Sequence, residues 1–393
     1  ATGIQFQDDI VMEILSRLSV RSLLQFKCVS KSWLALISDP YFKMKHLTKN
    51  NHKLLVCQSW LESVDMEPTI KFSFYSSPLS NAQELNCFSK YVQELDCHST
   101  FKPLECQLFC CFNGLVVLGF YSKFDQQLFL WNPSTRESTL LPHFEFTRLC
   151  TMFGLGYDVT SDGYKLLKWT MLKGGQSIEI LSLKSGSWRK ICYYPTTIAI
   201  CPRWGQKLTI YPYRNENWYM DTMVFVHGAF HWLGKTMSRT YHLVSFIFSN
   251  EVYGEIPLLE QMHITNEDVL SNYGLLLVEG MVCVSSTHKH QGWGTFKLWV
   301  MKDYGIKESW IVLFTIRLGN IVYGKLKHRF ANGEVLLYLF ETLASAPWTN
   351  RMVTFGHTAL RTSTGPFGFW PKYFRVHDGI AYTEGLISPK SLI

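Results

Sequence analysis

The chain has 393 residues, of which 47% are hydrophobic, 15% aromatic and 18% charged, and its net charge is +7. This composition excludes a disordered chain and is more typical of packed β-sheet than of coiled coil. The basic residues form no tract, so we expect no nucleic-acid partner. The longest apolar runs, at 275–278 and 335–340, are far shorter than the ~20 residues of a membrane-spanning helix, so we expect no membrane association.

The cysteines and the glycosylation pattern point to a reducing compartment. There are 11 cysteines, an odd number, and no two of them form a Cys-X-X-Cys pair. The one Asn-X-Ser/Thr sequence, at Asn132, has Pro133 in its middle, which blocks glycosylation. We therefore expect a cytoplasmic and/or nuclear protein, with cysteines that act mainly as small apolar residues within strands.

Helical periodicity is clear only in the first 48 residues. Apolar residues recur there at steps of three and four, and Asp8 and Asp9 are expected near the start of the first helix. Ser19 and Ser30 stand where N-caps belong, and Asp39-Pro40 supplies a third cap. The pattern predicts three or four short helices with tight joints.

This helical unit is too small to bury all of its apolar side chains. The first helix is apolar at Ile10, Ile14 and Leu18 and also at Val11 and Leu15, a stripe wider than one neighbouring helix covers. A partner protein is the expected cover, since exposed apolar patches on soluble proteins usually mark an interaction site. The alternative is that the unit packs on the chain's own sheets.

Residues 8–42 closely resemble the plant F-box motif, through E-I-L-x-R-L, S-L-L-x-F-K-C-V-S-K-S-W and L-I-x-D-P-x-F. The resemblance implies docking onto a Skp-type adaptor and, through it, a cullin–RING scaffold. It also implies which side chains lie at or under the adaptor interface: Ile10, Ile14, Leu15, Leu18, Leu23, Leu24 and Val29.

Two positions depart from the family pattern. The family usually has Leu-Pro before the first helix, where this chain has Phe6-Gln7, and Pro in the first joint, where this chain has Ser19. Losing these prolines could weaken adaptor binding. A protein-binding module derived from an F-box but without ligase activity is therefore a second hypothesis.

From residue 51 onward a polar residue followed by glycine recurs before an apolar strand. The recurrence is about every fifty residues, the size of a kelch-type propeller blade. These landmarks are Asn113-Gly114, Asp162-Gly163, His227-Gly228, Glu279-Gly280, Asn332-Gly333 and Asp378-Gly379. Partner strands that end in Trp or Pro follow each of the earlier landmarks. We predict a mainly β fold with a β-propeller-like domain of about six blades over residues 51–393, after an F-box at 1–48; an open sandwich is the alternative.

The last landmark leaves too few residues for a whole blade. Strands at 52–58 and 69–75 could complete it, so that one blade contains both ends of the chain. The stretch from 100 to 260 also resembles the F-box-associated domain found behind plant F-boxes. The matching segments are C-F-N-G-L around Asn113, W-N-P-S-T-R at 131–136 and F-G-L-G-Y-D at 153–158.

Motifs for catalysis, metal or cofactor binding are absent, so we predict a non-enzyme without cofactor or metal. Gly154-Leu155-Gly156 lacks the third glycine of a dinucleotide loop and is read as a bulged strand. Cys106, Cys110 and Cys111, with Cys97-His98, match no zinc-ligand spacing, and His288-Lys289-His290 is read as a solvated loop. A propeller enzyme such as a glycan or lactone hydrolase is the third hypothesis, which a titratable cluster in the central channel would support.

Three aromatic and basic segments are candidates for binding a target protein, because aromatic residues with Arg make good interaction hot spots. The first segment contains Arg203, Trp204, Tyr213, Arg214 and Trp218. The second contains Trp348 and Arg351, and the third is the range 367–373. Alternatively these side chains pack between blades. The sequence thus predicts the substrate-recognition subunit of a Skp–cullin–F-box E3 ubiquitin ligase, with an unidentified protein substrate.

Overall fold

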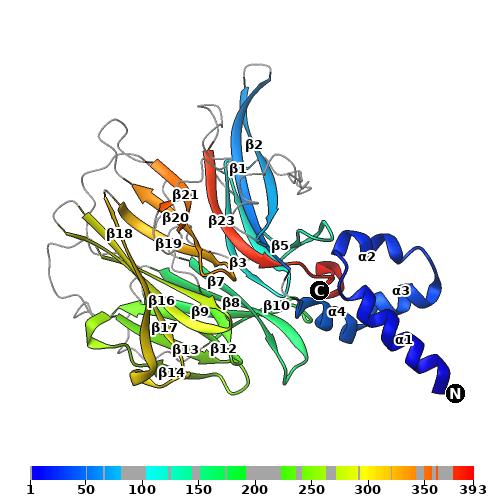
Figure 1. The fold of residues 1–393 in the computed structure, drawn as a ribbon. Helices are drawn as coiled ribbons and strands as arrows, with labels where there is room; N and C mark the ends of the chain where they lie inside the picture. Colours follow the sequence, from blue (N-terminus) through cyan, green and yellow to red (C-terminus); the bar gives the residue numbers. More distant parts are fainter. Residues whose placement is uncertain are drawn as a thin grey trace. The chain divides into compact units, whose positions relative to one another are not determined.

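The structure of the chain is a computed structural model (Figure 1). The residues it describes are 2–49, 51–64, 67–80, 103–122, 125–143, 151–172, 175–191, 223–235, 241–262, 271–290, 293–319, 321–341, 349–355, 360–361 and 375–393.

Four helices form the helical unit, residues 2–49, as predicted: α1 (Thr2–Leu15), α2 (Val20–Phe26), α3 (Lys31–Ser38) and α4 (Pro40–Leu47). The three predicted caps are confirmed. The backbone N–H groups of Ser22, Trp33 and Phe42 donate to the side-chain oxygens of Ser19, Ser30 and Asp39. The expected start of α1 was wrong, because the helix begins at Thr2 and places Asp8 and Asp9 in its middle.

The rest of the fold is antiparallel β-sheet, and five of its sheets are meanders of four strands in chain order. Their strands are β3 (Glu105–Phe112), β4 (Leu115–Tyr121), β5 (Gln126–Asn132) and β6 (Glu137–Leu140); β7 (Thr151–Asp158), β8 (Gly163–Leu172), β9 (Gly175–Ser182) and β10 (Ser187–Lys190); β11 (Val224–Val226), β12 (Ala229–Lys235), β13 (Tyr241–Ile247) and β14 (Val252–Ile256); β15 (Ser271–Val278), β16 (Met281–His290), β17 (Trp293–Met301) and β18 (Trp310–Gly319); and β19 (Ile321–Arg329), β20 (Val335–Glu341), β21 (Thr349–Phe355) and β22 (Leu360–Arg361). Short 3₁₀ helices are η2 (Glu260–Met262), η3 (Lys307–Ser309) and η5 (Pro389–Ser391).

The sixth sheet contains both ends of the β region, as predicted. Its central strand β1 (His52–Val64) pairs with β2 (Glu67–Pro78) on one side and with β23 (Arg375–Thr383) on the other. The described chain therefore has five four-stranded blades and one three-stranded sheet, in agreement with a mainly β propeller of about six blades. The meander topology, with one sheet following another along the chain, is not that of an open sandwich.

Five of the six glycine landmarks are the turns between the first and second strands of a sheet. Both residues of the Asn113-Gly114 turn have positive φ, 50° and 80°, as a type I′ hairpin requires. The sixth landmark was wrong. Asp378-Gly379 lies inside β23, next to an irregularity in its pairing with β1, because this segment closes a sheet started by the other end of the chain.

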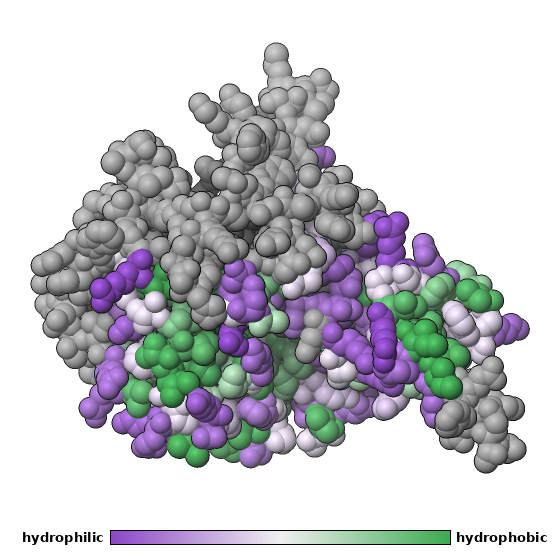
Figure 2. Space-filling model, in the orientation of Figure 1, coloured by the Kyte–Doolittle hydropathy of each residue, from purple (hydrophilic) through white to green (hydrophobic). Residues whose placement is uncertain are grey.

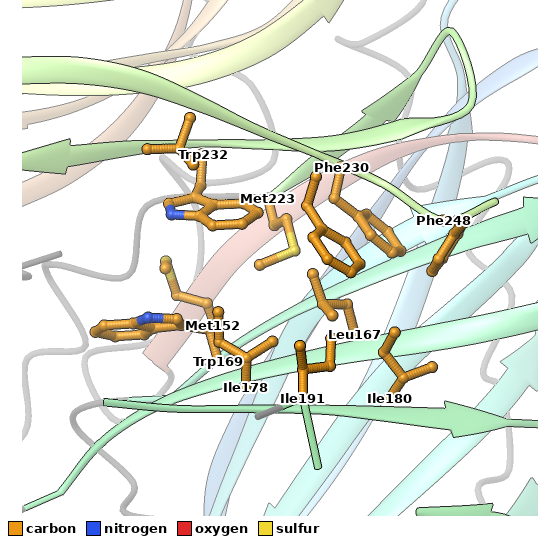
Figure 3. Close-up of a cluster of buried hydrophobic side chains, with 12 residues drawn as sticks. Met152, Leu167, Trp169, Ile178, Ile180, Ile191, Met223, Phe230, Trp232 and Phe248 are labelled. Carbon is orange, nitrogen blue, oxygen red and sulfur yellow. The ribbon is translucent and has the colours of Figure 1, made fainter. Parts of the chain in front are cut away.

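The chain divides into two compact units, residues 1–141 with 364–393 and residues 142–363. In the second unit each sheet packs on the next through apolar side chains. Figure 3 shows one such cluster, in which Trp232 and Phe230 of β12 face Trp169 and Leu167 of β8. Similar clusters join β11–β14 to β15–β18 and β15–β18 to β19–β22.

A Trp at the start or end of a strand donates to a Pro carbonyl at two places in this unit. The indole N–H of Trp188, in β10, donates to the carbonyl of Pro142 at 3.2 Å. Trp310, in β18, bonds in the same way to Pro257, which follows β14, at 3.1 Å. The Trp310 bond therefore holds the β15–β18 sheet against the β11–β14 sheet.

Gly154 and Gly156 lie in β7, where the pairing with β8 is continuous. The expectation of a strand is confirmed, but the expected bulge was wrong. A Cβ on Gly154 would lie 2.6 Å from the Met223 sulfur, and one on Gly156 would lie 2.6 Å from the ring of Phe225. The two glycines therefore make room for side chains of the next sheet.

Candidate functional site: an apolar face on the helical unit

The helical unit has a small core that draws on all four helices. Its buried side chains come from α1 (Leu15), α2 (Val20 and Leu23), α3 (Ile37) and α4 (Phe42). Leu386, from the C-terminal segment, completes this core. The unit is therefore packed and closed on its inner side.

A second set of apolar side chains on the same helices points to solvent. Ile10 is 51% exposed, Ile14 is 58% exposed and Val29, in the joint between α2 and α3, is 61% exposed. In Figure 2 hydrophobic side chains gather on the visible side of the helical unit. We call these three exposed aliphatic residues, Ile10, Ile14 and Val29, together the docking face, a name that stands for their shared exposure.

The seven residues predicted at or under the adaptor interface divide into three groups. Ile10, Ile14 and Val29 are exposed, Leu18 and Leu24 are partly buried, and Leu15 and Leu23 are inside the core. Leu34, Tyr41 and Met44 are also exposed and were not predicted, although they belong to the same apolar pattern. Spacing identified the apolar residues but not which of two neighbours, such as Ile14 and Leu15, points outward.

Basic side chains surround one carboxylate of α1 beside the docking face. Glu13 accepts from Arg17 at 2.9 Å and pairs with Lys45 of α4 at 2.9 Å and with Lys49 at 3.3 Å. These hydrogen bonds, that from Lys45 first, lower the pKa of Glu13 from 4.5 to about 2, and the same bond raises the pKa of Lys45. Glu13 therefore stays ionised well below neutral pH and ties α1 to α4 there.

The joint between α1 and α2 is held by the Ser19 cap and by a hydrogen bond from α4. His46 of α4 is buried, and its Nε2 lies 2.9 Å from the carbonyl oxygen of Leu18. Ser19, where the family pattern has proline, has φ −63° and ψ 151°. A proline ring imposes a φ of about −65°, so the serine holds the conformation that proline would impose.

The residues predicted to bind a target are not placed by the structure. Arg203, Trp204, Tyr213, Arg214 and Trp218 belong to the connection between β10 and β11, outside the described residues. Trp348 and the range 367–373 also lie outside them. Arg351 lies in β21, and only its backbone is described.

Only the strand ends from which these connections start are described. In a four-stranded meander, the first-to-second and third-to-fourth turns lie at one end of the sheet. The β10–β11 connection, which follows a fourth strand, and the β20–β21 connection, between a second and a third, both leave from the opposite end of their sheets.

The cysteines and histidines that could be taken for metal ligands lie in β-strands where the structure describes them. Cys106 and Cys110 are buried in β3, while Cys97-His98 lies outside the described residues. Among the described residues, no three His, Cys, Asp or Glu side chains gather as metal ligands would. His288, read as part of a loop, lies in strand β16 instead, and burial lowers its pKa to about 4.

In the part of the chain that the structure describes, no helix combines the length and apolar character needed to cross a membrane.

Two family models match the sequence. One, described as an F-box domain, matches residues 5–45, and the other, described as an F-box associated beta propeller domain, matches residues 60–344. The first covers the docking face, and the second begins in β1 and ends just after β20.

Curated relatives agree with these matches. The chain is 24% identical over 318 residues to an F-box/kelch-repeat protein of Arabidopsis thaliana, covering 78% of each protein. It is 24% identical over 335 residues to the F-box protein CPR1 of Arabidopsis thaliana, covering 79% of this chain and 72% of that protein. Among solved structures, TolB from Acinetobacter baumannii is similar with a TM-score of 0.42 at 9% identity, covering 90% of this chain and 73% of that one. A likeness this weak supports no conclusion about function.

Proposed function

Because the chain belongs to the F-box associated beta propeller family and carries an F-box before its propeller, we propose that it is the substrate-recognition subunit of a Skp–cullin–F-box E3 ubiquitin ligase. The coarser role, a substrate-recognition adaptor, is supported by both family matches and by the F-box relatives. The proposal adds the Skp-type adaptor, the cullin–RING scaffold behind it and a protein target.

The docking face is the observation that carries the proposal. Three large aliphatic side chains are more than half exposed on a unit whose own core is filled. Burying a side chain of this size is worth about 1.5–3 kcal/mol relative to leaving it in water. A helical adaptor that covers the three of them gains that free energy, together with contacts to the flanking basic residues.

The positions of the two missing family prolines are ordered without them. Ser19 has a proline-like φ of −63°, and its side-chain cap holds the start of α2. Phe6 and Gln7 lie within α1, so the chain at this point is helical rather than a free lead-in segment. The joint is thus already ordered before an adaptor binds.

In the proposed mechanism the protein supplies proximity and no catalytic residue. The helical unit binds the adaptor and the β domain binds the target, so the target's lysines are held at high effective concentration near the charged ubiquitin carrier. We propose that Arg203, Trp204, Tyr213, Arg214, Trp218, Trp348 and Arg351 contribute to target binding. Loops at the ends of a rigid sheet are the usual place for such a site.

The test is co-purification of the full chain with a purified Skp-type adaptor. Ile14→Asp combined with Val29→Asp places two charges on the docking face, and we expect adaptor binding to be lost while the fold is kept. Leu15 and Leu23 are unsuitable for this test, because they are buried in the core and a charge there would unfold the helices.

The matched control is Val159→Asp, in the turn between β7 and β8, where the side chain is 83% exposed and far from the helices in sequence. This variant should bind the adaptor as the unmodified chain does. If the unmodified chain does not bind the adaptor, or if the double variant binds it equally well, the ligase proposal is wrong and the F-box-derived binding module takes its place.

A further inference from the structure

The C-terminal segment after β23, residues 384–393, contacts the β-sheets and the helical unit of the same compact unit, and Figure 1 shows the C-terminus beside the helices. Where the segment begins, Glu384 is almost fully buried, and its carboxylate pairs with the Lys53 ammonium of β1 at 2.6 Å. The Glu384 backbone N–H donates to the carbonyl of Asn51 at 3.0 Å. The segment is therefore fixed to β1 at its first residue.

The next residue, Gly385, passes through a narrow space between the helical unit and the β3–β4 turn. A Cβ on Gly385 would lie 3.0 Å from the Asn113 carbonyl oxygen and 3.0 Å from the Leu47 side chain of α4. A Cβ on Gly114, in the β3–β4 turn, would lie 2.9 Å from the Gly385 backbone. At this point α4, the C-terminal segment and the β3–β4 turn are in mutual contact.

Asn132, at the end of β5, holds the segment from the sheet side. The side chain is fully buried, and its Nδ2 donates to the carbonyls of Gly385 at 2.9 Å and Ile387 at 2.8 Å. Its Oδ1 accepts from the backbone N–H of Ser134 at 2.9 Å. One side chain thus binds both the β5–β6 turn and the two carbonyls on either side of Leu386.

Leu386 points the other way, into the helical unit. It is 2% exposed and belongs to the core formed by Leu15, Leu23 and Phe42. Leu15 of this core follows the exposed Ile14 in α1, so the core that Leu386 completes and two residues of the docking face, Ile10 and Ile14, share one helix.

We propose that residues 384–392 act as a strap that couples adaptor docking to the β-sheets, with Asn132 and Leu386 as positioning residues. Pulling the strap away removes Leu386 from the helical core and leaves a cavity under α1 and α2. An adaptor that binds the ordered helices therefore stabilises the docked strap, and the docked strap holds the docking face in one orientation to the β3–β6 sheet. The coupling to the adaptor rests on the proposed function, whereas the anchoring of the strap by Asn132 and Leu386 does not.

The first experiment is amide hydrogen exchange on the full chain without adaptor, followed by mass spectrometry. Leu386→Ala should speed exchange in α1, α2 and residues 384–392 by about a hundredfold, because the core loses a filled position, and should leave β3–β5 unchanged. Asn132→Asp replaces the amide donor with a carboxylate oxygen, which cannot donate to the carbonyls of Gly385 and Ile387. This variant should speed exchange in residues 384–392. Leu386→Met, which keeps the side-chain volume, should leave exchange as slow as in the unmodified chain.

Asn250→Asp is the matched control, since Asn250 lies in the corresponding turn between β13 and β14 and its Oδ1 accepts from the Val252 N–H. It should leave exchange in residues 384–392 unchanged. Equal acceleration throughout β1–β6 in the two strap variants would show a general loss of stability and would overturn the positioning role. Unchanged exchange in the helices of Leu386→Ala would overturn the strap itself.

The second experiment repeats the measurement with a purified Skp-type adaptor. Adaptor binding should slow exchange at 384–388 by about fivefold or more in the unmodified chain and in Leu386→Met, but not in Leu386→Ala. Binding without this slowing overturns the coupling and leaves the proposed function intact. Failure of the unmodified chain to bind the adaptor overturns the proposed function, while the first experiment still decides the strap.

Discussion

The helical unit and the sheets of residues 142–363 differ in how completely they bury their apolar side chains. In the sheets, Trp232 and Phe230 are completely buried, because each sheet has a neighbour on which to pack (Figure 3). In the helical unit, Leu15 and Leu23 are buried, but Ile10 and Ile14 of the same pattern remain exposed. A repeated sheet provides its own cover, whereas a unit of four short helices has an inner side and an outer side and can cover only one of them.

This difference separates residues that hold the fold from residues that are available to a partner. Substitutions of buried side chains in the sheets should act on stability alone, and those on the docking face should act on adaptor binding alone. The C-terminal strap is the exception, since Leu386 belongs to the helical core and its neighbouring carbonyls are bound by Asn132 of β5.

The largest effect is expected in the sheets. Trp232→Ala removes a fully buried ring from the cluster between β8 and β12 and should lower the free energy of unfolding by about 3–5 kcal/mol. Urea denaturation followed by circular dichroism measures the loss. Val252→Ala, at an exposed position of β14, is the control and should change it by less than about 0.5 kcal/mol. Similar losses for both would contradict the packing described here.

The sharpest contrast lies within the helical unit itself. Leu23→Ala empties a core position and should cost about 2–5 kcal/mol of stability, while Ile14→Ala should cost less than about 0.5 kcal/mol. Adaptor affinity, measured by calorimetry on the folded chains, should fall about tenfold for Ile14→Ala, because the lost side chain is an interface anchor. A stable Leu23→Ala variant, or an Ile14→Ala variant that unfolds, would reverse the assignment of the two sides.

Acid should weaken the second unit through a buried histidine. His231 of β12 is completely buried, its Nε2 lies 2.6 Å from the Tyr304 hydroxyl, and burial lowers its pKa from 6.5 to about 4. Between these two values the unfolded chain binds a proton that the folded chain does not. Stability should therefore fall as the pH falls from 6.5 to 4, by about 3 kcal/mol at the lower end.

The measurement is the midpoint of urea unfolding as a function of pH. His231→Gln, which keeps a polar side chain but cannot titrate, should show a shallower fall over this range. A residual slope is expected from His288, whose pKa is also lowered to about 4 by burial. An identical slope in the variant and the unmodified chain would exclude His231 as the cause.

The smallest effect is expected at the joint between α1 and α2. Ser19→Pro loses a cap worth about 1 kcal/mol but restricts the unfolded chain by about 0.4–1 kcal/mol, and Ser19 already has a proline-like φ of −63°. Thermal unfolding should therefore change little, and adaptor affinity should stay within about threefold. A large gain in affinity would mean that the missing proline does limit adaptor docking.

Local features of the fold could be predicted because they depend on few neighbouring residues. The caps at Ser19, Ser30 and Asp39 and the hairpin turn at Asn113-Gly114 lie where they were expected. Asp378-Gly379 has the same residue types but lies within β23, because its conformation is decided by pairing with β1. A polar residue followed by glycine therefore does not by itself distinguish a turn from a strand that pairs with a distant segment.

The candidate site could be predicted only in part, for the same reason. Helical spacing identified Ile14 and Leu15 together, but burial separates them, since Leu15 meets Phe42 and Leu386 in the core. The segment after β23 carried no motif that connects it with the helices, and its role rests on hydrogen bonds from Asn132.

The sequence by itself determined the helical start, the repeated hairpins, the sheet shared by both ends of the β region and the family of the chain, because periodicity, caps and turn residues act within a few positions. Only the tertiary structure decided which apolar side chains face a partner, why Gly154 and Gly156 are glycines, and that Leu386 completes the helical core. These features depend on atoms that come from segments far apart along the chain, and burial is a property of such contacts rather than of any one segment.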